Sequence, residues 1–439
     1  MAYQDRYAEY LHKMKQDIHQ LAANGKRIVI GYTSDLDVVL RWDDTTFSNI
    51  LSTYLKHEPD VQPGDVIDSM EAFARIVSHY MIHGLGGEID ITNIQVCKYL
   101  ETQFHTEYAL GGTCAQGAAA LNAVGFPVLA HITDRSTEVC KRMSGQGLET
   151  VSEHGVVPML QSATTELPVR HMILQYPKGA TITVNGKTFQ APVSNRLIMD
   201  FDTIHKTMPV DRVFYDFCED HADQVLVYCV SGLNGIIDER IMAEKVDELA
   251  KHFQIVKSAN PDCRIYLEGA CYLNPELKNL VFDRLSNVVD FYGMNEEELV
   301  EHAQRFDQQT NKEDLPSVLS ALGLLLKQYP VRGIVLHTKD YAMYFGQKIA
   351  HADLEKGLTL GNLMAATRAR TGRYGSYEDC CDSMKLALSP DGIRFAEQIA
   401  QLQLEQSVCI VPSRYMEHPK YTIGLGDTFM AGCLTAFVR

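Results

Sequence analysis

The alternation of short buried strands with helices constrains the fold of this chain most. Apolar runs rich in β-branched residues occur at 27–32, 127–132, 224–230, 264–268, 288–293, 333–337 and 407–411. Helical patterns fill several of the gaps between them, as at 113–123, 239–253 and 275–285. Strands joined through helices run parallel and are covered on both faces. The sequence therefore predicts a large α/β domain built on a parallel sheet.

Two segments interrupt this alternation. Residues 43–82 have a helical pattern, whereas 171–176, 180–184 and 187–201 have the composition of strands. The dipeptide Asn185-Gly186 favours positive φ at both positions and predicts an antiparallel hairpin of 181–184 with 187–190. We therefore expect a smaller α+β domain inserted as two segments, 33–108 and 160–203. The large domain then comprises 1–32, 109–159 and 204–439.

Composition excludes several classes of protein. The 439 residues carry a formal charge of -16, which disfavours nucleic acid or an anionic membrane as the main partner. No stretch approaches the roughly 20 apolar residues of a membrane span, and the charged amphipathic start lacks the apolar core of a signal peptide. The eleven cysteines include no CxxC pair, so reduced thiols and a cytoplasmic location are expected. The oligomeric state is not set by the sequence.

The segment Gly424-Leu425-Gly426-Asp427 precedes an apolar, small-residue helical pattern at 429–437. The first N–H groups of a helix have no internal partner and bind anions, and glycines allow a ligand to approach the backbone. A phosphoryl group undergoing transfer fits such a turn. Asp427 itself has two interpretations, either as a cap of the helix or as the base that takes the proton of an attacking hydroxyl.

Two other phosphate-binding motifs are excluded because the residues at their required positions differ. A G-x-G-x-x-G dinucleotide motif would need glycine where Phe429 stands. The segment Gly186-Lys187-Thr188 resembles the end of a Walker A motif, but Thr181 stands in place of its first glycine and the segment belongs to the predicted hairpin.

Acidic residues follow two of the predicted strands. Asn295 and Glu298 come directly after the strand at 288–293, and Glu268 ends the strand at 264–268. The first pair either favours the helix dipole or holds hydrated magnesium beside phosphates. Ligands of open α/β sheets bind at the carboxyl ends of strands, which is where Glu268 lies.

These acidic residues, Gly111-Gly112 ahead of a helix and the C-terminal GLGD together resemble the ribokinase superfamily, specifically its ADP-dependent glucokinase and phosphofructokinase branch. The resemblance extends over most of the chain. It implies a ribokinase-like, three-layer doubly wound sheet with an inserted α+β lid that closes on a sugar. Two departures stand out. Tyr266-Leu267-Glu268 replaces the usual His-x-Glu, and Asp35-Leu36-Asp37 replaces the usual Asn-x-Asp.

The resemblance also implies roles for individual residues. Asp427 is the expected base, with the backbone of Gly424, Leu425 and Gly426 as anion hole. Glu268 and Glu298 are expected to hold Mg²⁺. The remaining residues implied by the resemblance are Asp35, Asp37, Gly111 and Gly112 for the acceptor, and Asn295, His337, Thr338, Val411, Pro412 and Ile423 for the nucleotide. The basic residues of the inserted segments, Arg170, Lys178 and Arg196, are candidates for contact with a sugar phosphate, with solvated surface as the alternative.

The expected function is Mg²⁺-dependent phosphoryl transfer from ADP or ATP to a hydroxyl of a sugar phosphate such as fructose 6-phosphate. One alternative is an ADP-dependent glucokinase that acts on free hexose. Another, of a different class, is a regulatory protein that binds nucleotide and sugar without turnover. The expected partners are the sugar and the adenine nucleotide, with no nucleic acid and no membrane.

Overall fold

The large sheet extends to both sides of its first strand. In the computed structural model, which describes residues 3–62, 64–184 and 186–438, β1 (Arg27–Tyr32) pairs in parallel with β5 (Val128–Ile132) and with β12 (Val225–Ser231). Five strands follow β12 on one side, namely β13 (Arg264–Glu268), β14 (Phe291–Asn295), β15 (Gly333–His337), β16 (Tyr341–Gly346) and β17 (Ser407–Pro412). Beyond β5 lie β6 (Leu148–Ser152) and β7 (Gly155–Pro158).

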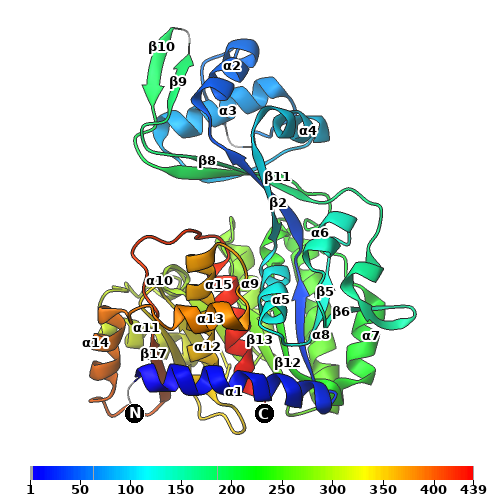
Figure 1. Ribbon diagram of the computed structural model, residues 1–439, viewed down its shortest axis with the longest axis vertical. Coiled ribbons are helices and arrows are strands. Elements are labelled where there is room, and N and C mark those ends of the chain that lie inside the picture. Colours follow the sequence, from blue (N-terminus) through cyan, green and yellow to red (C-terminus); the bar gives the residue numbers. More distant parts are fainter. Residues whose placement is uncertain (1–2, 63, 185, 439) are drawn as a thin grey trace.

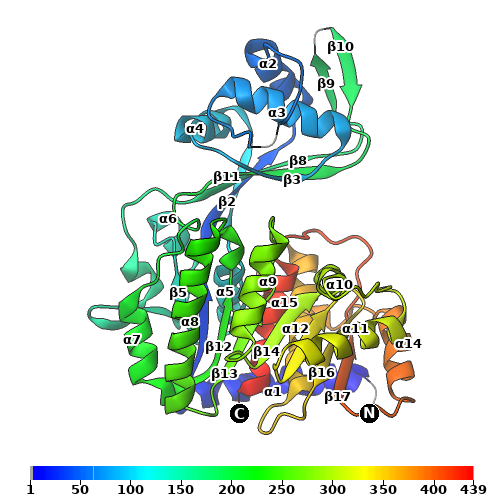
Figure 2. The same ribbon diagram turned by 180° about the vertical axis from the view of Figure 1, so that it is seen from behind.

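Helices cover both faces of this sheet, so its inner strands are buried almost throughout. One face carries α1 (Tyr3–Ala23), α5 (Thr113–Ala123), α12 (Leu354–Thr371), α13 (Tyr377–Ser383) and α15 (Leu425–Cys433) (Figure 1). The other carries α7 (Arg212–Asp220), α8 (Glu239–Ala259), α9 (Pro275–Leu285), α10 (Glu296–Gln304) and α11 (Leu315–Gln328) (Figure 2). Helix α14 (Pro390–Ile399) packs on the edge strand β17.

A second, smaller sheet lies above the first (Figure 1). Its order is β3 (Gly87–Asp90), β11 (Asn195–Phe201), β8 (Arg170–Tyr176), β2 (Asp35–Arg41) and β4 (Thr106–Gly111). Helices α2 (Asp44–Tyr54), α3 (Met70–His83) and α4 (Ile94–Gln103) lie on the side of this sheet that faces away from the large one (Figure 1). Helix α6 (Thr137–Arg142) lies where the two bodies meet.

The predicted hairpin is present, with β9 (Thr181–Val184) antiparallel to β10 (Lys187–Gln190). Gly186 has the predicted positive φ of 76°, while Asn185 lies outside the described residues. Short 3-10 helices occur at η1 (Met159–Ser162), η2 (Ala222–Gln224), η3 (Leu233–Gly235) and η4 (Leu434–Phe437). No described helix is long and apolar enough to cross a bilayer.

The structure corrects several expectations. Strand β2 was not predicted, because its first residues include two aspartates, although almost all of its residues are buried. Strand β16 was also missed, and it makes the sheet antiparallel at that edge, as β7 does at the other. The pattern at 43–82 corresponds to two helices, α2 and α3. Strand β14 begins only at Phe291, since Val288 and Val289 turn back onto Leu285.

Candidate active site

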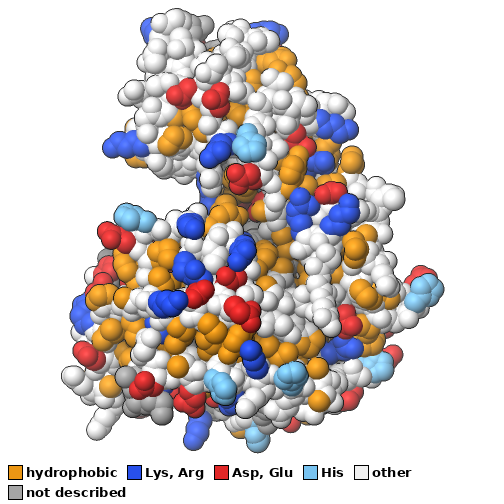
Figure 3. Space-filling model, viewed as in Figure 1, with side chains coloured by type: hydrophobic (Ala, Val, Ile, Leu, Met, Phe, Trp, Pro, Cys, Tyr) orange, Lys and Arg blue, Asp and Glu red, His pale blue; other side chains and the backbone are white. Residues whose placement is uncertain are grey.

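Polar residues lie at the carboxyl ends of the strands of the large sheet, directly below the small sheet. Thr33 follows β1, Gly232 follows β12, and Glu268, Asn295 and His337 end β13, β14 and β15. A cleft opens between the two bodies at this edge, as the hollow in Figure 3 shows. Carboxyl ends of strands are the usual ligand sites of open α/β sheets. The cleft therefore lies where the sequence predicted.

The GLGD turn enters this cleft at the start of α15. Gly424 is the N-cap with φ of 69°, a left-handed conformation that favours glycine, and a Cβ there would lie 2.1 Å from Gln116 Oε1. Asp427 is the third residue of the helix and does not cap it. The interpretation of Asp427 as an N-cap is therefore wrong. Burial is the main factor that raises the pKa of Asp427, to about 6, and Glu268 adds to the effect.

The same turn borders two cavities. A cavity of about 350 Å³ on the side of the small sheet includes Ile423 and Asp427 in its lining. A second cavity of about 510 Å³, over the ends of β14 and β15, is lined by Leu425, Gly426 and Phe429 from the same segment. Cavities of this size hold small molecules. We call the first the acceptor cavity and the second the donor cavity.

Carboxylates dominate the acceptor cavity. Its acidic lining residues are Asp35, Asp37, Glu88, Asp200, Asp202 and Asp427. Gly111 allows Asp35 to approach, since a Cβ on Gly111 would lie 1.8 Å from Asp35 Oδ1. Gly112, which starts α5, and Gln116 complete the large-domain side. These groups accept and donate hydrogen bonds in several directions, as recognition of a polyhydroxylated molecule requires.

His171 lies among these carboxylates. Its Nδ1 is 3.2 Å from Asp35 Oδ1 and its Nε2 is 3.8 Å from Asp200 Oδ1. Burial acts to lower the pKa of His171, but Asp35, Asp200 and Asp37 outweigh it and raise that pKa to about 10. Burial in turn raises the pKa of Asp37 and of Asp200 to about 7 each. His171 is therefore an imidazolium at neutral pH.

A metal is a poor occupant of this cluster. Asp35, His171 and His205 place one possible ligand atom each within 4.8 Å of one another. Metal-bound histidine must be unprotonated, whereas the neighbouring carboxylates favour the protonated form of His171. His205 already contacts Asp202 and Thr133 through its two ring nitrogens, at 2.8 and 2.7 Å. The cluster is better suited to hydrogen-bonding sugar hydroxyls.

Basic side chains lie further out on the same face of the small sheet. Arg196, Gln175 and Arg41 are paired neighbours on β11, β8 and β2 and line a groove of about 680 Å³ that adjoins the acceptor cavity through Arg196. The other two predicted cations are elsewhere. Arg170 pairs with Glu101 at 2.9 Å, and Lys178 is exposed, and neither is among the described residues that line these cavities.

Two carboxylates approach each other beside the donor cavity. Asn295 caps α10 and Glu298 accepts from the Asn295 N–H at 3.0 Å, so the pair forms a capping box. Glu268 Oε1 contacts His337 Nε2 at 2.9 Å, while its Oε2 is buried and has no hydrogen-bond partner within residues 3–62, 64–184 and 186–438. Burial, followed by the charge of Glu268, raises the pKa of Glu298 to about 7. Burial, followed by the charge of the neighbouring Glu268, raises the pKa of Tyr266.

The predicted nucleotide residues divide between the donor cavity and its surroundings. His337 and Thr338 line this cavity with Asn295, although the Thr338 hydroxyl is bonded to the turn that leads into β16. Ser413 and Arg414 line it in place of Val411 and Pro412, which are strand residues behind it. Ile423 lines the acceptor cavity instead.

Several site residues were not predicted. Asp200 and His171 face Asp37 because they occupy matching positions on adjacent strands, so alternation along the strands was the signal that identifies them. Gln116 follows Gly112 by one helical turn on α5. Arg368, buried in the middle of the site, comes from α12, where no motif marks it.

Comparison with known proteins agrees with this geometry. Residues 26–436 match the conserved region of ADP-specific phosphofructokinase/glucokinase. The ADP-specific phosphofructokinase of Pyrococcus horikoshii is 22% identical over 94% of this chain and 97% of its own length. The ADP-dependent glucose/glucosamine kinase of Pyrococcus abyssi is 24% identical over 81% and 80%.

Solved structures show the same fold. The reconstructed last common ancestor of ADP-dependent phosphofructokinases from Methanosarcinales has a TM-score of 0.82 at 18% identity, covering 99% of this chain and 98% of its own. An ADP-dependent kinase in complex with fructose 6-phosphate and ADPβS has a TM-score of 0.75 at 18% identity over the same shares. The predicted fold class is confirmed. The match over most of its length shows that the chain belongs to the ADP-specific phosphofructokinase/glucokinase family.

Proposed function

We propose that this chain is a Mg²⁺-dependent kinase that transfers the terminal phosphoryl group of ADP to a hydroxyl of a sugar phosphate such as fructose 6-phosphate. One observation carries the proposal: the GLGD turn borders two cavities, with Asp427 on the acceptor side and Gly426 on the donor side. A phosphoryl group that crosses from one cavity to the other must pass this turn. The activities named for the relatives support the same reaction.

In the proposed step the acceptor hydroxyl attacks the β-phosphorus of ADP. The new O–P bond forms as the bond to the bridging oxygen breaks, and AMP leaves with that electron pair. Asp427 takes the proton of the hydroxyl, and a pKa of about 6 suits a base that works near neutral pH. The free N–H groups at the start of α15 stabilise the charge that develops on the transferred group.

The donor side fits Mg²⁺. The unpartnered Glu268 Oε2 and the nearby Glu298 provide two carboxylates whose mutual repulsion a cation would relieve. Magnesium keeps several waters and needs few protein carboxylates. Glu268 and Glu298 would hold the ion, which when bound neutralises the phosphate oxygens of the donor.

The acceptor side supports a sugar phosphate bound lengthwise. Asp37 and Arg41 project from the same face of β2, and four residues of strand span about 13 Å. If the sugar hydroxyl lies beside Asp37 and Asp427, the phosphate of the same molecule therefore extends toward Arg41 and Arg196. The carboxylates nearest Asp427 favour a second candidate, a free hexose, because they repel any phosphate placed close to them.

We also propose that the small sheet and its helices act as a lid. This lid comprises 33–108 and 160–203, and the large domain comprises 1–32, 109–159 and 204–439. Closure of the lid over the acceptor cavity would exclude water from the phosphoryl donor. We propose the cytoplasm as the compartment, where thiols such as these eleven unpaired cysteines stay reduced.

The test is consumption of ADP by wild type and by Asp427→Asn, with Mg²⁺ and with fructose 6-phosphate or glucose. Wild-type turnover should fall as the pH drops through about 6, because the base must be ionised. The variant should retain ligand binding and lose about 10²- to 10⁴-fold in kcat. Near-wild-type turnover by Asp427→Asn excludes it as the base, and binding without consumption by wild type favours the regulatory class. Activity on glucose alone selects the free hexose.

A further inference from the structure

Arg368 is a buried cation at the GLGD turn, and no acidic side chain in the described part of the chain forms an ion pair with it. Only 3% of the residue is exposed, and the groups that accept its hydrogen bonds at the turn are uncharged. Nε donates to the Ile423 carbonyl oxygen at 3.0 Å, and Nη2 donates to Gln116 Oε1 at 2.6 Å. Nη1 is buried and has no hydrogen-bond partner among the residues that the structure describes. Buried charges are normally paired because desolvation is costly, so an unpaired one at a site calls for a functional reason.

Its contacts connect Arg368 to the anion hole. The Ile423 carbonyl belongs to the same peptide unit as the Gly424 N–H, so the bond from Nε fixes the plane of that peptide. A Cβ on Gly424 would lie 2.9 Å from Nη2 and 2.1 Å from Gln116 Oε1, so the guanidinium and the amide pack directly on the glycine. Substituting Arg368 would free this peptide to rotate.

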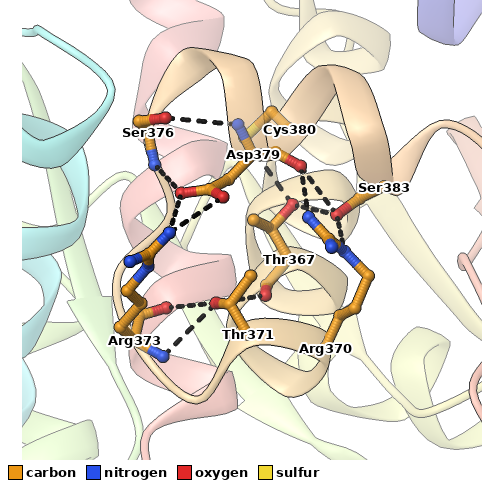
Figure 4. A network of polar contacts seen from close by, with 8 residues as sticks. All are labelled: Thr367, Arg370, Thr371, Arg373, Ser376, Asp379, Cys380 and Ser383. Carbon is orange, nitrogen blue, oxygen red and sulfur yellow. Dashed lines mark hydrogen bonds and ion pairs between the residues drawn. The ribbon is translucent and has the colours of Figure 1, made fainter.

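Aromatic rings hold the guanidinium in place. Its centre lies 4.1 Å from the Tyr374 ring and 5.3 Å from the Tyr421 ring. Tyr374 lies in the short connection between α12 and α13, and Figure 4 shows the polar network that fixes this connection. In that network Ser376 and Asp379 form a capping box, and Thr371 donates to the Arg373 carbonyl at 3.0 Å. Arg368 is therefore preorganised, as an element of a catalytic site must be.

The charge of Arg368 also acts on Asp427. Four charged groups face this carboxylate, namely Glu268 on β13, Arg368 on α12, His337 on β15 and Asp37 on β2. Burial and Glu268 raise the pKa of Asp427, whereas Arg368 and His337 lower it, and Asp427 in turn raises the pKa of Asp37. Arg368 thus favours the ionised form in which the base accepts a proton.

We propose that Arg368 is a positioning residue for phosphoryl transfer: it holds the Ile423–Gly424 peptide in the orientation that forms the anion hole, and it fixes a positive charge near Asp427. This inference rests on the proposed function of the site. It assigns Arg368 no contact with substrate, since its free Nη1 is enclosed.

Three variants test the proposal. Arg368→Gln removes the charge, and Arg368→Lys keeps the charge but cannot bond Ile423 and Gln116 together. Arg264→Gln is the control, because Arg264 is also buried and donates to a backbone carbonyl, that of Pro261 at 2.9 Å, but at the other end of β13. The measurements are kcat and KM across pH, with the thermal unfolding midpoint of each variant.

Arg368→Gln should lower kcat about a hundredfold, which is the loss typical of a damaged anion hole. KM for the sugar should not change. The acidic limb of the pH profile of kcat should move to higher pH. Arg368→Lys should restore that limb but not kcat. Arg264→Gln should lose stability alone. If Arg368→Gln keeps wild-type kcat and pH limb, or changes only in stability like the control, Arg368 is merely structural and the proposal is wrong.

A readout without turnover separates this proposal from the proposed function. In protein labelled with ¹³C at the aspartate carboxyl, the signal missing from Asp427→Asn identifies Asp427, and its titration gives the pKa directly. That pKa should be higher in Arg368→Gln than in wild type, in the absence of Mg²⁺ and nucleotide. If wild type consumes no ADP, the proposed function fails, while an unchanged pKa in Arg368→Gln overturns the present proposal independently.

Discussion

Burial and charge act in the same direction on four carboxylates of the cleft. Burial raises the pKa of Asp37, Asp200, Asp427 and Glu298, and in each case a neighbouring carboxylate raises it further. Such a site is electrostatically unfavourable when empty and gains from ligands that bring positive charge or hydrogen-bond donors. Mg²⁺ on the donor side and sugar hydroxyls on the acceptor side have these properties.

Glu298→Gln tests the donor side. Glutamine can still accept from the Asn295 N–H, so α10 should keep its cap, but the charge beside Glu268 is lost. We expect the Mg²⁺ concentration for half-maximal rate to rise about tenfold or more. Titration of the rate with Mg²⁺ measures this.

The control for that titration is Glu297→Gln, on the same helix turn, whose carboxylate pairs with Lys312 at the surface. It should leave the Mg²⁺ requirement unchanged. An equal shift in both variants would reflect general surface charge and would exclude a specific role for Glu298.

Residues of this site differ in how far the sequence reveals them. Asp427, Glu268 and Glu298 follow strand ends or glycines, and their place at the cleft could be predicted from local pattern. Arg368 could not, because its partners Gln116 and Ile423 lie far away in the sequence and only packing of α12 brings them together. Cations on the lid were predicted by type, but the ion pair of Arg170 with Glu101 depends on tertiary contact.

At the scale of elements, local pattern predicted most helices and strands of the large sheet. Helix α5 has the predicted bounds, and the hairpin of β9 and β10 pairs as its turn dipeptide required. Strand β2 was missed because a strand whose cleft face carries Asp35 and Asp37 has the composition of a loop. The antiparallel direction of β16 depends on a tight connection after His337 that has no helix.

The row formed by β11, β8 and β2 gives a prediction for the lid. Arg41→Met and Arg196→Met should each raise KM for fructose 6-phosphate about tenfold, since a charge-assisted hydrogen bond is lost, while KM for glucose changes little. Initial rates with both sugars measure this. Lys187→Met is the control, because it removes a cation from the exposed hairpin strand β10, away from this row.

Equal effects of the two arginine variants on both sugars would contradict a phosphate subsite at this row. The free-hexose candidate would then be preferred, because the carboxylates beside Asp427 disfavour a phosphate placed close to them.

At the scale of the whole molecule, one buried ion pair joins three distant segments. Lys356 Nζ on α12 donates to Asp17 Oδ2 on α1 at 2.6 Å and to the Val438 carbonyl at 2.8 Å. Lys356 is 1% exposed and Asp17 is 2% exposed. The pair lies where α1 crosses the large domain, at the end remote from the lid (Figure 1).

Asp17→Asn should destabilise the large domain by about 3–5 kcal/mol, because the Lys356 charge stays buried without its partner. Urea unfolding followed by circular dichroism measures the loss, and kcat under native conditions should not change. Asp382→Asn, which removes an exposed partner of Lys385, should leave the unfolding curve where it is. A wild-type unfolding curve for Asp17→Asn would show that the pair contributes no net stability.

The central place of β1 has a consequence for the order in which the protein is made. Its partner β12 begins at Val225, whereas every strand of the small sheet lies between Asp35 and Phe201. During synthesis, the small sheet is therefore complete before β1 acquires its second neighbour. The smaller domain can fold on the ribosome first, while one edge of β1 is still unpaired.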